Sequence, residues 1–169
     1  VESGLPAEVI TTVHGNRLLS QALVSAREIR MVSFTGGFRT GEAIAAAAGI
    51  KKVSMELGGN APVLVFGDAD LTTAVARCVS GSFWAAGQNC IGTQRIIVHE
   101  SVADRFRNEF VAATSRLTTG DPSKESTDVG PMISEAAANS AQQSVEAAVA
   151  ADARLLEGVL DDFGVKGEI

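Results

Sequence analysis

The sequence predicts an α/β fold, and three observations lead to that class. Short apolar runs typical of β-strands alternate along the chain with segments of helical periodicity. Glycines and helix-capping residues stand between the two kinds of segment. Hydrophobic residues make up 46% of the 169 residues, which is enough to build a core. We therefore expect a globular chain that forms one domain of ordinary size or parts of two.

The first third of the chain contains three apolar, strand-like runs, at residues 9–13, 31–35 and 53–57. Helical periodicity separates them, first over residues 17–27 and then after Gly36 and Gly37 up to Ala48, where Gly49 ends the pattern. The order strand, glycine turn, helix, strand is typical of an α/β unit.

The rest of the chain continues the alternation. Asp70 is a good N-cap for a helix whose apolar stripe includes Cys78. The other expected elements are strands at 63–66, 95–99 and 154–157, a capping box at 101–104, a long amphipathic helix at 102–117, a loop at 120–131 and an alanine-rich helix at 134–151.

Charge and composition exclude several classes of function. The formal net charge of -6 and the absence of a basic run argue against nucleic acid and against a membrane surface as partners. Two cysteines, two histidines and no C-x-x-C predict neither a disulfide framework nor a metal site. The first residues lack a signal peptide, so a cytoplasmic location is expected. The missing initiator Met indicates a processed chain or an excised segment.

The segment 83–95 places Cys90 in a glycine-containing loop between a helical pattern and an apolar run, where a scaffold presents a reactive group. Cys78, by contrast, is expected in the core. Glu56 lies at the end of a strand-like run, where a carboxylate can act as a general base. A Cys-His hydrolase would need His14 or His99 beside Cys90, and the spacing neither supports nor excludes this.

Gly36 and Gly37 form a turn between a predicted strand and a predicted helix, and free N–H groups at such a helix start can bind phosphate. The spacing from Gly36 to Gly41 invites comparison with a P-loop. Glu42 and Ala43 follow, however, where Lys and Ser or Thr are required, so we exclude a P-loop. Taken alone, the two glycines are more typical of a tight turn.

Several motifs together resemble those of the aldehyde dehydrogenase superfamily. Residues 55–62 (Met-Glu-Leu-Gly-Gly-Asn-Ala-Pro) resemble its glutamate motif, and residues 87–90 (Gly-Gln-Asn-Cys) resemble its cysteine motif. Residues 32–36 resemble the strand and phosphate-side turn of its cofactor site, and residues 68–71 and 130–133 resemble further signatures. The resemblance implies an aldehyde dehydrogenase-like α/β fold. The second part of a Rossmann-type NAD(P)-binding domain (1–57) is then joined to an incomplete α/β catalytic domain (58–169).

The resemblance also implies a reaction. Cys90 matches the nucleophile that attacks an aldehyde to give a thiohemiacetal, whose hydride passes to the nicotinamide of NAD or NADP and leaves a thioester. Glu56 matches the base that activates water to hydrolyse this thioester, and the backbone N–H of Cys90 matches one oxyanion donor. The presence of Glu56 favours a carboxylic acid product over an acyl-CoA.

The cofactor site implied by the resemblance lies mostly in residues 1–57. Gly36, Gly37 and Gly41 match the turn beside the cofactor phosphates, Gly15 matches an earlier cofactor-side loop, and Leu57 matches a position near the nicotinamide. The family usually has Ser where this chain has Gly37. A second departure is Ser20, which stands where the family commonly has glycine.

Members of the family are about three times as long, consistent with multi-domain size. The terminal Glu168 and Ile169 echo the start of a later family motif. Two interpretations follow: an NAD(P)-dependent aldehyde dehydrogenase, active with the rest of the protein and expected to be a homo-oligomer, or a non-catalytic fragment or assembly module. The fragment alone is expected to be marginally stable because half a sheet leaves an open edge and face. The sequence leaves the aldehyde, and the choice between NAD and NADP, open.

Overall fold

The structure, a computed structural model, describes residues 4–155 and confirms the α/β class. The chain forms two compact units, Val1–Gly58 and Gly59–Ile169, and each is described by itself. Within the described residues no helix is both long and apolar enough to cross a membrane.

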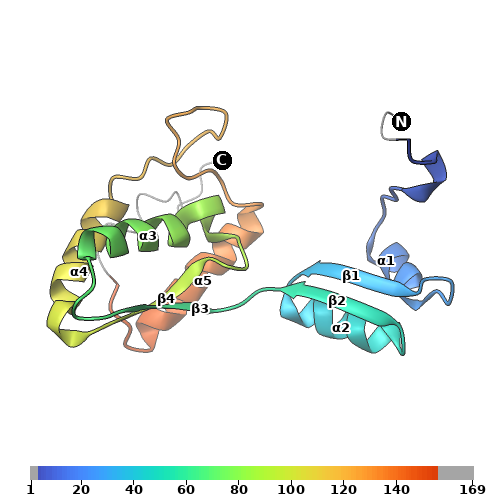
Figure 1. Ribbon diagram of the computed structural model, residues 1–169, viewed down its shortest axis with the longest axis horizontal. Helices are drawn as coiled ribbons and strands as arrows, with labels where there is room; N and C mark the ends of the chain where they lie inside the picture. The colour runs from blue at the N-terminus through green and yellow to red at the C-terminus, as the bar shows by residue number, and fades with distance from the viewer. Residues whose placement is uncertain (1–3, 156–169) are drawn as a thin grey trace. The chain divides into compact units, whose positions relative to one another are not determined.

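The first unit is built around a two-stranded parallel sheet (Figure 1). Its strands β1 (Met31–Gly36) and β2 (Lys52–Leu57) pair in register along their whole length, from Met31 opposite Lys52 to Gly36 opposite Leu57. The helix α2 (Phe38–Ala48) makes the crossover between them and ends at Gly49, whose φ of 66° favours glycine. Before the sheet lie η1 (Ala7–Val9) and α1 (Arg17–Ser25).

The second unit repeats the strand, helix, strand order. Its strands β3 (Ala61–Val65) and β4 (Thr93–Val98) are parallel, and the connection between them contains α3 (Leu71–Phe83) and η2 (Trp84–Gly87). Two further helices follow, α4 (Glu100–Thr114) and α5 (Glu135–Ala150) (Figure 1). The loop between these helices is closed by a bridge between Thr119 and Val129.

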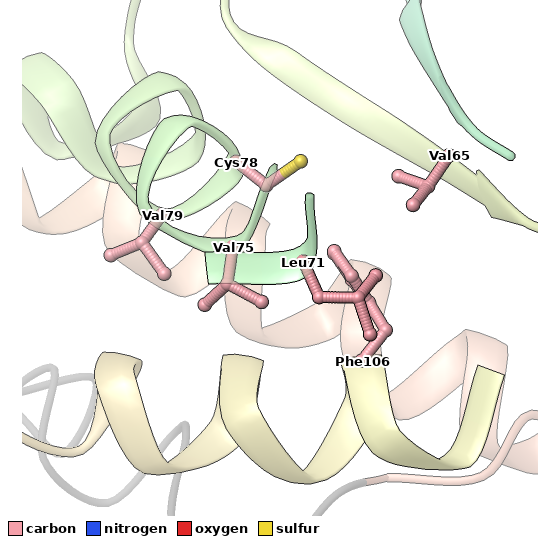
Figure 2. Close-up of a cluster of buried hydrophobic side chains, with 6 residues drawn as sticks. All are labelled: Val65, Leu71, Val75, Cys78, Val79 and Phe106. Carbon is pink, nitrogen blue, oxygen red and sulfur yellow. The ribbon is translucent and has the colours of Figure 1, made fainter. Parts of the chain in front are cut away.

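The core of the second unit lies where α3 meets α4 and one face of the β3–β4 sheet. Figure 2 shows its buried members, which come from β3, α3 and α4: Val65, Leu71, Val75, Cys78, Val79 and Phe106. Cys78 is only 2% exposed, so its prediction as a core residue is confirmed. Burial disfavours the charged thiolate and raises the pKa of Cys78. This thiol is therefore a packing group.

Some predicted elements differ from the structure. The strand expected at 9–13 is wrong: residues 10–13 form no regular element, because β-propensity alone does not make a strand, and the sheet of the first unit contains β1 and β2 only within the described residues. The capping box at 101–104 is also wrong, since α4 begins earlier and its N-cap is His99, whose Nδ1 accepts the Ser101 N–H. The strand expected at 154–157 lies partly outside the described residues, and its described part is irregular.

Candidate functional site

Cys90 lies in the short loop between η2 and β4, and its side chain is exposed. The chain reaches this loop through an unusual backbone: Ala85, Ala86 and Gly87 all have φ values between 53° and 72°. Two consecutive alanines in the left-handed region are strained, and such strain persists only where the surroundings enforce it. The turn follows the end of α3, so Cys90 lies outside the periodicity of that helix.

Amide side chains hold this loop. Asn89 donates through Nδ2 to the Trp84 carbonyl at 3.2 Å, and Gln88 donates through Nε2 to the Ala85 carbonyl at 3.1 Å. The Oε1 of Gln88 accepts the backbone N–H of Ile133 at 2.9 Å, across 45 residues of sequence. The loop therefore has two local ties and one long-range tie.

Two glycines, Gly92 in the loop and Gly59 outside it, lie near atoms of the loop. A methyl group on Gly92 would come within 3.1 Å of the Asn89 side chain, and one on Gly59 would lie 3.5 Å from the Cys90 carbonyl oxygen. Arg95 donates through Nε to the Asn60 carbonyl at 3.1 Å, which fixes the start of β3 beside β4. Residues 59–60, which belong to the segment that resembles the glutamate motif, and the Cys90 loop are thus neighbours in the second unit.

Glu56 belongs to the first unit. It lies on β2 opposite Thr35 of β1, one residue before the strand ends, and its side chain is exposed. The expectation that this carboxylate lies at an accessible strand end agrees with its position. Glu56 and Cys90 are thus carried by different units.

The glycines predicted at the cofactor site gather around the β1–α2 turn. Gly36 ends β1, Gly37 is the N-cap of α2, and Gly41 lies buried on the first turn of that helix. A methyl group on Gly41 would approach Cδ2 of Leu57 to 2.7 Å, so this glycine lets α2 pack on the end of β2. Gly37 makes no side-chain cap, and nothing lies within 4 Å of a methyl group placed on it.

Gly15 stands apart from this group, just before α1. A methyl group there would overlap the side chain of Leu19, so glycine permits the close approach of the chain to α1. The N-cap of α1 is Asn16, whose side chain accepts the N–H groups of Leu18 and Leu19. Ser20 is an exposed residue of the same helix.

The structure therefore brings together Gly36, Gly37, Gly41 and Leu57 in the first unit. The sequence reasoning missed the tie between Gln88 and Ile133. Both residues lie in segments that it had marked separately as family-like, but no pattern in the sequence indicated that one contacts the other. Among residues 4–155, no group of three or more His, Cys, Asp or Glu side chains is placed to hold a metal ion.

The α/β fold, the exposed cysteine and the glycine turn agree with the family that the sequence motifs resemble. The chain matches the aldehyde dehydrogenase family over residues 1–167. It is 60% identical over 157 residues to the aldehyde-dehydrogenase-like protein y4uC of Sinorhizobium fredii, covering 93% of this chain and 31% of that protein. It is 54% identical over 158 residues to aspartate-semialdehyde dehydrogenase 1 of Pseudomonas canavaninivorans, covering 94% of this chain and 34% of that protein.

Among solved structures, an E. coli NADP-dependent enzyme aligns with a TM-score of 0.88 at 37% identity, over 93% of this chain and 34% of the other. The chain therefore belongs to the aldehyde dehydrogenase family. It spans about a third of the length of the curated relatives it matches.

Proposed function

We propose that this chain carries the chemical residues of an NAD(P)-dependent aldehyde dehydrogenase that oxidises an aldehyde to a carboxylic acid. In this proposal residues 1–57 are the later part of the cofactor domain, and residues 58–169 are the nucleophile-bearing part of the catalytic domain. The observation that carries it is the exposed Cys90, held on a strained and hydrogen-bonded loop, while the second cysteine is buried.

The first half of the reaction is acylation of Cys90. The thiolate adds to the aldehyde carbon, the C–S bond forms, and the carbonyl oxygen becomes an oxyanion. The backbone N–H of Cys90 donates to this oxyanion, as one of the donors that stabilise developing charge. When bound, NAD or NADP would be the oxidant, as the acceptor of the hydride that the thiohemiacetal carbon loses when the Cys90 thioester forms.

The second half is hydrolysis of the thioester. Glu56 takes a proton from water, the resulting hydroxide attacks the acyl carbon, and the C–S bond breaks. The carboxylic acid leaves and the Cys90 thiolate is regenerated. The exposure of Glu56 near the end of β2 supports this role, because a base for water must be reached by water.

The β1–α2 turn fits a dinucleotide phosphate. No side chain caps α2, so its first backbone N–H groups are available to an anion, and the helix dipole favours negative charge there. The open space at Gly37 allows close approach of a ligand to the backbone. We propose that Gly36 and Gly37 contact the phosphates, that Gly41 and Leu57 shape the neighbouring surface, and that Gly15 belongs to a cofactor-side loop.

The first test is the replacement Cys90→Ser, with Cys78→Ser as the matched control. The enzyme is assayed for aldehyde-dependent formation of NADH and NADPH with a panel of short aldehydes that includes aspartate semialdehyde. We expect Cys90→Ser to lower turnover by at least about a thousandfold because the nucleophile is lost. The Cys78 variant should keep most of the activity of the parent. Full turnover by the Cys90 variant would contradict the proposal.

The second test separates the two half-reactions. With Glu56→Gln we expect a rapid burst of about one NADH per Cys90, followed by slow turnover, because acylation proceeds and deacylation lacks its base. Rapid-mixing absorbance at the reduced nicotinamide band measures the burst. Acid-quenched mass spectrometry should find the acyl group on Cys90. Loss of the burst together with turnover would show that Glu56 acts before the thioester forms.

A second candidate function has its own support. Leu64 and Ile97 lie side by side on β3 and β4, and they are 58% and 53% exposed. An apolar sheet face of this kind fits a non-catalytic fragment or assembly module of an aldehyde dehydrogenase, and pairing with further chain, including a homo-oligomer, would cover it. This function is favoured if Cys90→Ser leaves the rate of aldehyde oxidation unchanged while the chain still binds other aldehyde dehydrogenase chains or copies of itself.

A further inference from the structure

We propose that Gln88 is a positioning residue for Cys90, acting as a clamp between the nucleophile loop and the segment that precedes α5. The expected effect of Gln88 on kcat rests on the proposed function. The expected effect of Gln88 on the order of the Cys90 loop does not. Gln88 stands two residues before Cys90. Nothing in the reaction assigns it a chemical role, so its contacts must define what it does.

The clamp has two ends. At one end the Nε2 of Gln88 and its own backbone N–H both donate to the Ala85 carbonyl, at 3.1 and 3.0 Å. This carbonyl belongs to the left-handed turn that carries the chain out of α3. At the other end the Oε1 accepts the Ile133 N–H at 2.9 Å. One side-chain amide therefore uses its donor and its acceptor to join two backbones.

The far end of the clamp leads into a well-held segment. Val129 is buried, pairs with Thr119, and accepts the Gly120 N–H at 3.1 Å. Asp128 accepts the Thr118 N–H through Oδ2 at 2.8 Å. Directly after Ile133, Ser134 caps α5. The loop is thus tied to a segment that is fixed on both sides of the contact.

The local ties cannot replace this clamp. The Asn89 side chain reaches Trp84 and so holds the loop only to its own preceding turn. The turn itself contains two alanines at positive φ, a conformation that the isolated segment would leave. A hydrogen bond to a distant, ordered backbone favours the native turn over relaxed alternatives. Because the bond is near the surface, its strength is modest, and we expect it to order the loop without holding the fold.

The proposal predicts where disorder will appear. Gln88→Met keeps the length of the side chain and removes both hydrogen bonds. We expect amide hydrogen exchange to rise about fivefold to tenfold at Ile133 and, together with it, at residues 89–92. Exchange in α3 and β4 should stay within about twofold of the parent. Gln142→Met is the matched control, because Gln142 bonds only Glu146 on α5 among the described contacts.

Two further variants test the bond itself. Gln88→Glu keeps an acceptor for the Ile133 N–H, so exchange at that amide should return to within about twofold of the parent. Ile133→Pro removes the donor, whereas Ile133→Ala keeps it. We expect Ile133→Pro to loosen residues 89–92, and the double variant to be no looser than Gln88→Met alone, because Gln88→Met has already removed the bond that Ile133→Pro removes.

The kinetic arm uses the enzyme that contains this chain. Gln88→Met should lower kcat on the order of tenfold and leave the KM for aldehyde within about twofold, because a misplaced nucleophile slows the step without weakening binding. Iodoacetamide should still alkylate the exposed Cys90 at nearly the parent rate, since this small reagent needs no fixed orientation.

The proposal is overturned if only Ile133 responds and residues 89–92 do not, or if α3 and β4 loosen equally, which would give Gln88 a general structural role. An unchanged kcat in an active enzyme would also overturn it. If the parent enzyme shows no Cys90-dependent turnover, the proposed function fails, and the exchange measurements still decide whether Gln88 orders the loop.

Discussion

The two strand-to-helix junctions of this molecule, β1 to α2 and β3 to α3, have the same topology but opposite chemistry. Each joins two parallel strands through a helix. At α3 the N-cap Asp70 accepts the Thr72 N–H at 3.1 Å and the Thr73 hydroxyl at 2.6 Å. At α2 the N-cap is Gly37, which makes no side-chain bond.

The residue that follows each cap shows the same contrast. Leu71, the first residue of α3, is 5% exposed and belongs to the core, whereas Phe38, the first residue of α2, is 66% exposed. A helix start that is capped and packed contributes to stability. A helix start that is left open contributes little to folding and keeps its N–H groups for a ligand. We infer that the first unit gives up stability at the place where it is proposed to bind a phosphate.

The largest expected effect compares the two first helical residues. Leu71→Ala should lower the free energy of unfolding of the second unit by about 3 kcal/mol, because it leaves a cavity between α3 and the sheet. Phe38→Ala should cost less than about 0.5 kcal/mol, since the ring is largely exposed already. Urea unfolding followed by circular dichroism measures both. Equal losses would remove the contrast between the junctions.

An intermediate effect should appear when the open junction is closed. Gly37→Asp would cap α2 and place a carboxylate where the cofactor phosphates are proposed to lie. We expect the Kd for NADH or NADPH to rise about tenfold while the helix is stabilised by up to ~1 kcal/mol. Gly37→Ser supplies a cap without charge and should leave the Kd within about twofold. Equal binding by both variants would argue that no phosphate approaches this turn.

The sequence predicted the regular elements of both junctions well. The strands at β1, β2, β3 and β4, the N-cap Asp70 and the buried Cys78 all follow from local periodicity and capping chemistry, which act over a few residues. The expected strand at 9–13 failed because a strand needs a partner edge, and its own composition cannot supply one. The N-cap of α4 was predicted two residues too late, at Ser101, because His99 is a rarer type of N-cap residue than serine.

The candidate site was less accessible to sequence reasoning. The glycines of the β1–α2 turn could be marked, but the close approach of Gly41 to Leu57 depends on how α2 crosses the sheet. The bond between Gln88 and Ile133 joins residues 45 positions apart through one side-chain oxygen. No periodicity encodes such a contact. It depends on the left-handed turn at Ala85 and Ala86, and alanine gives no sign of that conformation in a sequence.

The smallest expected effect concerns the capped junction and its dependence on pH. Hydrogen bonds from Thr73 and Thr72 hold the pKa of Asp70 below its ordinary value of 3.8. A carboxyl group whose pKa is lower in the folded state stabilises that state above its unfolded pKa, and this contribution is lost as the pH falls through the folded pKa. Asp70→Ala should therefore lower the Tm at pH 7 and change it much less at pH 3.

Thermal unfolding of the parent and the variant at pH 7, 5, 4 and 3 measures this difference. The difference in Tm between parent and variant should be constant from pH 7 to 5 and shrink below about pH 4, near the unfolded pKa. Gly37→Ala is the matched comparison at the open junction, because neither glycine nor alanine places a carboxyl group at the N-cap, so its Tm difference from the parent should not depend on pH through the cap. If the difference in Tm between the parent and Asp70→Ala stayed the same down to pH 3, the charge of the cap would contribute nothing to stability. Only the conclusion about the uncapped β1–α2 junction would then be kept.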